Sequence, residues 1–289
     1  LTIAPSWTRI APMKIVDAHT HILPPEMIAA REALAGRDRW FGLLYDHPRA
    51  RMATAEELIA AMDAAGVAAA ITFGFAFADM GLCRECNAYV LAAARRYPGR
   101  LFPFLVVNPA RTEEALRTAR DGLEAGGAGL GELMPDGQGF ALTDFPLLDP
   151  LLDLARQHSV PLMIHINEPV GHAYPGKGGQ GPEQAYRLAL HSPQNTLILP
   201  HWGGGLPFYE LMPEVRAALR RVYYDTAASP YLYADAVLCH VLAWAPDKVL
   251  WGTDYPLLGM DRFLRRVRSV GLGEDALAKL LGGNALAAL

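Results

Sequence analysis

The sequence has few cysteines, no excess of basic residues and no apolar run long enough to cross a membrane. Its three cysteines cannot all pair with one another, which excludes the disulfide framework of small secreted domains. The N-terminal residues lack the charged and apolar regions of a secretory signal, so we expect a cytoplasmic protein. A net charge of −4 argues against a nucleic-acid partner, and the lack of about 20 consecutive apolar residues argues against a membrane span.

The sequence does contain enough apolar material for a large core, because 52% of its 289 residues are hydrophobic. A single α/β barrel takes about 250 residues, so we expect one domain that spans residues 1–289. No G-x-G-x-x-G motif follows the first apolar run, which counts against a dinucleotide-binding fold.

Eight short apolar runs alternate with stretches of helical periodicity. Runs of this kind, rich in Val, Ile, Leu or Phe, are typical of parallel strands that are buried on both faces. The predicted strands are 14–21, 68–75, 101–108, 129–134, 161–167, 196–202, 221–226 and 248–254. Thr54 and Glu57 predict a capping box at the start of one helix, and Gly66 predicts its end. Eight strands that are each followed by a helix predict an α/β fold, a single-domain (β/α)8 TIM barrel.

Three long segments stand outside this alternation, at 23–51, 135–145 and 168–182. They follow strands one, four and five, so we expect long loops at the C-terminal face of the barrel strands. Barrel enzymes build their sites on that face, which makes these loops candidate pocket walls or lids.

Two histidines, His19 and His21, stand two residues apart in the first predicted strand. Side chains at this spacing point to the same face of a strand, so both imidazoles project into one space. Polar residues also end four later apolar runs; they are Glu132, His165, His201 and Asp254.

A closed barrel brings these strand ends together. His19, His21 and His165 offer nitrogen ligands, and Asp254 offers an oxygen ligand that can also accept a proton. The pattern therefore predicts a divalent metal site, in which His201 orients a water molecule or polarises the substrate. A metal-free site, in which the histidines act only as acid and base, is the alternative.

Substrate contacts are predicted on the long loops and beside the sixth strand. The cations Arg37, His172 and Lys177 suggest an anionic substrate, although each also suits a solvated surface. Tyr174 and Trp202 could stack against a ring, and packing at the barrel mouth would require the same residue types.

Taken together, these motifs resemble the amidohydrolase superfamily, in a branch similar to aminocarboxymuconate-semialdehyde decarboxylase. The resemblance rests on Val-Asp-Ala-His19-Thr-His21, Leu-Met-Ile-His165, His201-Trp-Gly-Gly, Trp-Gly-Thr-Asp254-Tyr-Pro and Gly-Gly-Asn284-Ala. It extends over nearly the whole chain. It implies one divalent ion, commonly zinc, bound by His19, His21, His165 and Asp254. It also implies a catalytic role for His201 and proton transfer by Asp254.

Glu132 is the one residue whose role the resemblance does not decide. In binuclear members of the superfamily a strand-four residue bridges two metals, and TatD-like hydrolases use a glutamate there. Glu132 is therefore read in three ways: as a ligand that brings a second metal, as a residue that holds a ligand, or as a substrate contact.

Three functions follow as hypotheses. The first is a metal-dependent hydrolase that uses a metal-activated water on a small carboxylated amide, ester or lactone. The second is a lyase that decarboxylates an aromatic or unsaturated acid without oxidation at the same site. The third is a non-catalytic barrel that serves as a binding scaffold, against which the complete ligand set argues. The expected partners are a small-molecule substrate and a second copy of the chain in a homodimer.

Overall fold

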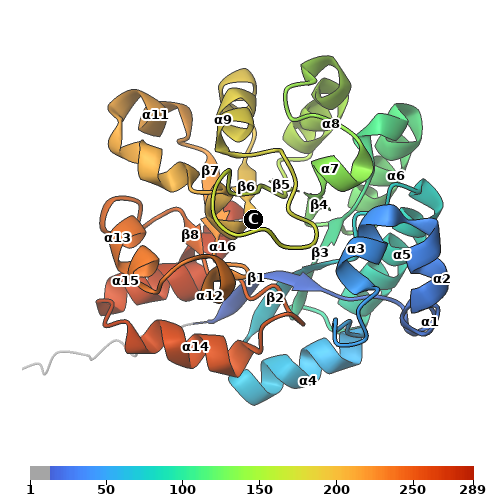
Figure 1. The fold of residues 1–289 in the computed structure, drawn as a ribbon, viewed down its shortest axis with the longest axis horizontal. Helices are drawn as coiled ribbons and strands as arrows, with labels where there is room; N and C mark the ends of the chain where they lie inside the picture. The colour runs from blue at the N-terminus through green and yellow to red at the C-terminus, as the bar shows by residue number, and fades with distance from the viewer. Residues whose placement is uncertain (1–13) are drawn as a thin grey trace, which may run out of the picture.

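The computed structural model describes residues 14–289, which contain one barrel of eight parallel strands (Figure 1). The strands pair in chain order from β1 to β8, so each is hydrogen-bonded to its neighbours in sequence. Their bounds are β1 Val16–His21, β2 Ala69–Phe73, β3 Leu101–Leu105, β4 Gly129–Leu133, β5 Leu162–Ile164, β6 Leu197–Leu199, β7 Val222–Asp225 and β8 Val249–Leu250.

The barrel is closed by main-chain hydrogen bonds between β1 and the segment that begins at the end of β8. The Ala18 N–H donates to the Trp251 carbonyl at 2.8 Å, and the His21 N–H donates to the Tyr255 carbonyl at 2.8 Å. This closure sets the end of the first strand beside the residues that follow the last one.

Helices cover the outside of the barrel (Figure 1). Their bounds are α1 Pro25–Ala29, α2 Arg31–Arg37, α3 Arg39–Tyr45, α4 Ala55–Ala65, α5 Met80–Arg96, α6 Thr112–Glu124, α7 Pro135–Gln138, α8 Phe145–Gln157, α9 Pro182–His191, α10 Pro200–Gly203, α11 Pro213–Ala218, α12 Ser229–Leu232, α13 Ala236–Trp244, α14 Met260–Ser269, α15 Glu274–Ala278 and α16 Asn284–Ala288. Short 3₁₀ or π turns add η1 Pro109–Arg111, η2 Leu206–Leu211 and η3 Lys279–Gly283. None of the helices within residues 14–289 is long and apolar enough to span a membrane.

The predicted barrel is confirmed, and every observed strand lies within its predicted range. Strands β5, β6 and β8 stop before His165, His201 and Asp254, because the chain leaves the sheet at these positions. His201 and Asp254 take positive φ angles of 57° and 61°, which are incompatible with a continuing strand.

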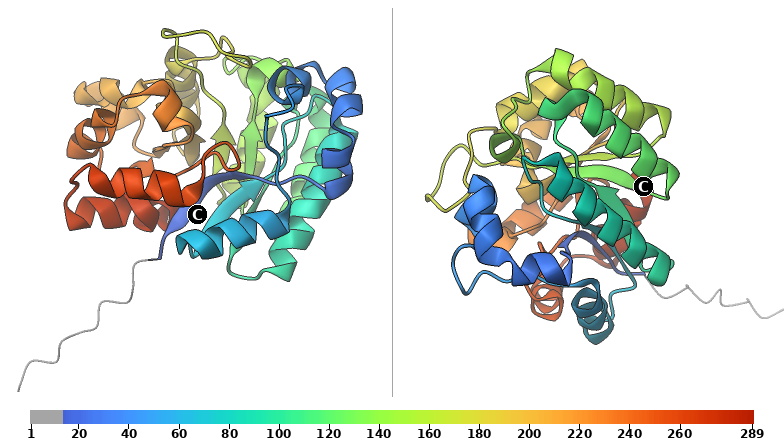
Figure 2. Two further views of the ribbon diagram at one scale, coloured as in Figure 1. Left: turned by 60° about the horizontal axis from the view of Figure 1, so that its bottom comes forward. Right: turned by 90° about the vertical axis from the view of Figure 1, so that its right-hand side faces the viewer.

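The segment 23–51, predicted as a long loop, instead contains the helices α1, α2 and α3. Asp38 makes α3 possible, because its Oδ1 accepts hydrogen bonds from the N–H groups of Trp40 and Phe41. Figure 2 shows these helices (blue) on the same side of the barrel as the loop at 168–181 (yellow-green). The two segments touch, since a Cβ on Gly176 would lie 2.6 Å from Leu44.

The predicted capping box of α4 is present, and we expect it to stabilise the folded protein. Thr54 Oγ1 accepts from the Glu57 N–H at 3.3 Å, and Glu57 Oε2 accepts from the Thr54 N–H at 2.8 Å. We expect Thr54→Ala to lower the free energy of unfolding by about 1 kcal/mol in urea titrations, because one helical N–H loses its acceptor. Thr118→Ala, inside α6, is the matched control. An equal loss in both variants would contradict the capping role.

Candidate metal centre

The two histidines of β1 and the aspartate after β8 meet at the carboxyl end of the barrel. His19 Nε2 lies 3.2 Å from His21 Nε2 and 3.6 Å from Asp254 Oδ1, and His21 Nε2 lies 3.3 Å from the same oxygen. The Asp254 N–H donates to the His19 carbonyl at 3.0 Å, so barrel closure itself brings these groups together.

Glu132, from β4, adds a fourth ligand atom to this cluster. Its Oε2 lies 3.7 Å from His19 Nε2 and 3.9 Å from His21 Nε2. Ligand atoms about 2.1 Å from an ion at tetrahedral angles are separated by about 3.4 Å. Five of the six distances among these atoms run from 3.2 to 3.9 Å, and the triad of His19, His21 and Asp254 fits a divalent metal ion.

Hydrogen bonds on the far side of each ring turn both imidazoles toward this point. His19 Nδ1 lies 2.8 Å from Asp225 Oδ2, and His21 Nδ1 lies 3.2 Å from the Gly74 carbonyl. Both partners can only accept, so Nδ1 carries the hydrogen in each ring. Nε2 is therefore the nitrogen through which each ring, in its neutral form, can bind a cation.

Asp225, at the end of β7, is a site residue that sequence reasoning missed. It is fully buried, and its Oδ1 also accepts hydrogen bonds from the N–H groups of His201 and Ala227, at 3.0 Å each. The only signal in the sequence was a carboxylate after the apolar run that begins at Val222. Asp225 thus positions two of the site histidines.

His165 lies beside Glu132, outside the four-atom cluster. Its Nδ1 is 2.9 Å from Glu132 Oε1, and its Nε2 is 3.3 Å from Asn167 Oδ1. His201 donates from Nδ1 to the Ala227 carbonyl at 3.0 Å, which leaves its Nε2 facing His165 Nδ1 at 3.2 Å. His19, His21 and Asp254 bring three ligand atoms within 4.8 Å of one another, and so do His19, Glu132 and His201.

An unusual turn holds His201 in place. His201, Trp202 and the three following glycines all have positive φ, between 52° and 98°. Gly204 also passes so close to the β5 loop that a Cβ there would lie 2.3 Å from the Asn167 carbonyl oxygen. The glycine run therefore serves a left-handed turn and a close backbone approach, at a functional position where such strain is typical.

The charges in this cluster are strongly coupled. Burial alone would lower the pKa of His19, but the carboxylates of Asp225, Glu132 and Asp254 outweigh it and raise that pKa to about 10. Burial would raise the pKa of Glu132, but the imidazoles, led by His19, lower it to about 2. The same balance lowers the pKa of Asp254. The buried carboxylates are therefore stabilised by nearby positive charge, which a proton on His19 or a metal ion can supply.

A pocket of about 620 Å³ opens above the cluster. Its wall includes His172 and Tyr174, two of the predicted substrate contacts, together with Glu132, His165 and Asp254. Two further cations, Arg49 and Arg51, also line it, and sequence reasoning did not single them out. They lie on the segment between α3 and α4.

The other predicted substrate contacts are not among the residues that line this pocket. Arg37 is paired with Asp79 at 2.7 Å beside a different pocket. Trp202 is fully buried, with its indole N–H donated to Ser229 Oγ at 2.9 Å. Lys177 Nζ donates instead to main-chain carbonyls of its own loop, at 2.7 and 3.1 Å.

The raised pKa of His19 predicts that metal binding releases a proton. With a pKa of about 10, His19 is protonated at pH 7 before the ion binds, and only the neutral ring can bind it. We therefore expect metal affinity to rise with pH between 6 and 9. Calorimetry in buffers of different ionisation enthalpy should detect about one proton released per ion at pH 7.

Asp225→Asn is the informative variant for this prediction. Loss of the carboxylate that faces His19 Nδ1 lowers the pKa of the ring and weakens its orientation. We expect metal affinity to fall about 10- to 100-fold, with fewer protons released. Asp247→Asn, on the surface, is the control. Metal affinity independent of pH in the parent protein would contradict the role given to His19.

Solved structures that share this fold include two 5-carboxyvanillate decarboxylases and a 2,6-dihydroxybenzoate decarboxylase. A 5-carboxyvanillate decarboxylase from Sphingomonas paucimobilis is 19% identical, with a TM-score of 0.74 over 96% of this chain and 98% of that one. The corresponding enzyme from Novosphingobium aromaticivorans, complexed with manganese and 4-hydroxy-3-methoxy-5-nitrobenzoic acid, is 18% identical, with a TM-score of 0.79 over 96% of each chain. A 2,6-dihydroxybenzoate decarboxylase complexed with 2,6-dihydroxybenzoate is 18% identical, with a TM-score of 0.72 over 96% of this chain and 99% of that one.

A search of curated protein sequences gave no match. The amidohydrolase family model matches residues 16–289, which include every site residue described above. The resemblance seen in the sequence motifs is thereby confirmed: the chain belongs to the amidohydrolase family of metal-dependent enzymes.

Proposed function

We propose that the protein removes a carboxylate from a small aromatic or unsaturated acid as carbon dioxide, without oxidation. The observation that carries this proposal is a cluster of possible metal-binding side chains at the base of a pocket that is also lined by aromatic residues and two arginines. The similar structures of 5-carboxyvanillate and 2,6-dihydroxybenzoate decarboxylases support it. Decarboxylation, the second hypothesis of the sequence analysis, thus replaces hydrolysis as the leading one.

The pocket wall suits a flat, anionic substrate. Tyr45, Phe75 and Tyr231 contribute aromatic surface against which a ring can stack. The guanidinium groups of Arg49 and Arg51 can bind carboxylate oxygens through paired N–H donors. Neither arginine forms an ion pair with any residue in 14–289, so both are available to a ligand.

For the metal, we propose His19, His21 and Asp254 as ligands, with Glu132 as the fourth. Glu132 is preferred to His165 because its Oε2 lies within 4 Å of Nε2 of both His19 and His21, while its Oε1 is hydrogen-bonded to His165 Nδ1. Zinc and manganese both suit this nitrogen and oxygen set, and manganese accompanies one of the similar structures. A divalent ion held there supplies Lewis acidity toward an anionic substrate.

His165 and His201 are the groups placed to handle the proton. Both line the pocket, and their ring nitrogens lie 3.2 Å apart, so a proton can pass between them. In the reaction the bond between the ring carbon and the carboxyl carbon breaks, carbon dioxide leaves, and the electron pair on the ring carbon takes a proton. Burial lowers the pKa of His201, whereas the Glu132 carboxylate outweighs burial and raises the pKa of His165. We therefore assign delivery of that proton to His201 Nε2, which takes it from His165 Nδ1 at 3.2 Å.

The proposal predicts incorporation of solvent hydrogen. With hydroxybenzoates that carry one or two carboxyl groups as substrates in D₂O, we expect one deuterium on the carbon that lost the carboxylate. Mass spectrometry of the product and a carbon dioxide assay check this together. Consumption of amide, ester or lactone analogues, with no carbon dioxide from any acid, would contradict decarboxylation and favour hydrolysis.

The arginines of the pocket predict a defect in substrate binding. We expect Arg51→Ala to raise KM about tenfold while metal content stays unchanged, because one charge-assisted contact to the substrate is lost. Arg49→Ala should act in the same direction. Arg120→Ala, which removes an exposed charge from α6, is the control. An unchanged KM in both pocket variants would exclude these arginines as the carboxylate contact.

A further inference from the structure

We propose that Lys177 is a positioning residue, which holds the ring of Tyr174 in place as a wall of the catalytic pocket. Both residues belong to the loop between β5 and α9, which projects from the barrel (Figure 2). Tyr174 lines the pocket, whereas Lys177 is not among the residues that line it. The inference rests on the proposed function only in taking this pocket as the substrate site.

A tight turn sets the two side chains next to each other. The sequence Tyr174-Pro175-Gly176-Lys177 has proline and glycine at its second and third positions, as a type II turn favours. Gly176 has a φ of 85°, and the Lys177 N–H donates to the Tyr174 carbonyl at 3.2 Å. The turn brings the Lys177 ammonium to 5.5 Å from the centre of the Tyr174 ring, within the range of a cation–π attraction.

The Lys177 ammonium also connects distant points of its own loop. It donates to the Val170 carbonyl at 2.7 Å and to the His172 carbonyl at 3.1 Å, and it lies 3.4 Å from Glu168 Oε1. The side chains of Lys177 and Glu168 are only 17% and 11% exposed, so water and salt screen this ion pair less than a pair at the surface. One cation thus fixes the start of the loop against the turn that carries Tyr174.

Glu168 contacts both residues, because each of its carboxylate oxygens has a different partner. Its Oε1 faces the Lys177 ammonium, and its Oε2 accepts a hydrogen bond from the Tyr174 hydroxyl at 3.2 Å. The polar end of Tyr174 is therefore held within the loop. What Tyr174 offers a substrate is the surface of its ring, against which a flat molecule can stack.

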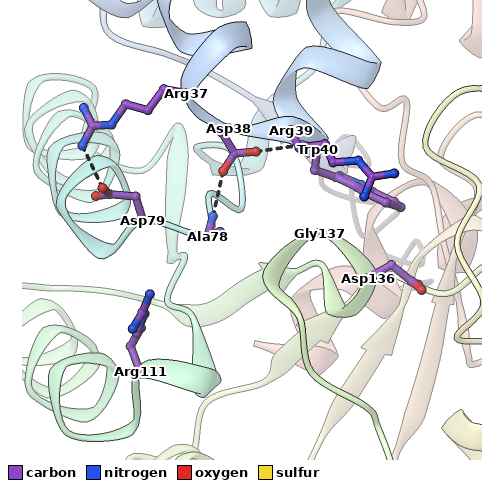
Figure 3. A pocket seen from close by; sticks show the side chains of 9 residues that line it. All are labelled: Arg37, Asp38, Arg39, Trp40, Ala78, Asp79, Arg111, Asp136 and Gly137. Carbon is purple, nitrogen blue, oxygen red and sulfur yellow. Dashed lines mark hydrogen bonds and ion pairs between the residues drawn. The ribbon is translucent and has the colours of Figure 1, made fainter.

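The far end of the loop has a separate anchor. Asp136, on α7 (Figure 3), accepts hydrogen bonds from the N–H groups of Gly179 and Gln180 at 2.9 and 3.3 Å. In the part of the chain that the structure describes, no main-chain N–H from 169 to 176 has an acceptor, so this part of the loop depends on Lys177 and Glu168 for its order. Without them, a substrate would have to order the pocket wall as it binds, which weakens binding.

The test compares Lys177→Met with the parent, both loaded with the metal. We expect subtilisin to cut within 168–177 faster in the variant, as mass spectrometry of the fragments can show, because the loop opens more often. We expect KM to rise about tenfold while kcat stays within about twofold and metal content is unchanged. KM is measured with whichever class the parent turns over, an acid or an ester, so failure of the decarboxylation proposal leaves this test intact.

Two double variants show whether Lys177 acts through Tyr174. Lys177→Met combined with Tyr174→Ala should have the KM of Tyr174→Ala alone, since the ring that Lys177 positions is already gone. Lys177→Met combined with Glu168→Gln removes both charges of the ion pair. This variant should raise KM as much as Lys177→Met does, which separates lost positioning from the effect of an unpaired carboxylate.

Lys279→Met, which breaks an exposed ion pair with Asp247, is the matched control and should behave as the parent does. Circular dichroism melting curves check that each variant is folded. Equal rates of cleavage in the parent and Lys177→Met would overturn the proposal. So would a fall in kcat at unchanged KM, or an effect of Lys177→Met on KM that persists in full when Tyr174 is replaced by alanine.

Discussion

The structure depends on the attraction between carboxylates and imidazoles gathered at one end of the barrel. Glu132 and Asp225 are buried, and Asp254 lies beside them. Removing three carboxylates from water at one place is costly unless positive charge accompanies them. The charge comes either from protonation of His19 or from a bound cation, and the ligand-atom spacing suits the cation. A bound metal ion would therefore also stabilise this end of the barrel, because it would balance the charge of the buried carboxylates.

The barrel brings these carboxylates and imidazoles together in space. His19 and His21 both come from the end of β1, and the other side chains come from the ends of later strands. The closure between β1 and the residues after β8 sets the first ligands beside the last. The left-handed backbone at His201 and Asp254 turns their side chains away from the strand direction. Gly252 permits the tight packing behind them, since a Cβ there would lie 2.9 Å from His19 Cβ.

The sequence was sufficient to predict the barrel, because buried parallel strands are nearly continuous apolar runs. It also predicted His19, His21 and Asp254 together, since spacing on a strand and position at a strand end are local features. Asp225 could not be predicted with the same certainty, because its partner His19 is 206 residues away along the chain. The choice of Glu132 over His165 that we propose rests on where the Glu132 carboxylate lies relative to His19 and His21, which no sequence pattern encodes.

The substrate contacts were predicted less well, for a similar reason. Arg37 was assigned to the pocket because its segment follows β1, but the helices α2 and α3 direct it toward Asp79 instead. The same helices lead the chain back so that Arg49 and Arg51 line the catalytic pocket. Trp202 was expected to stack against a ring, yet the left-handed turn buries it against Ser229. The homodimer remains a prediction.

The most direct test of the central claim is a crystal structure of the protein with anomalous data at the metal edge, combined with elemental analysis. We expect one divalent ion per chain, bound by Nε2 of His19 and His21 and by carboxylate oxygens of Asp254 and Glu132. Two ions per chain, or one ion bound by His165 with Glu132 outside its coordination sphere, would contradict it.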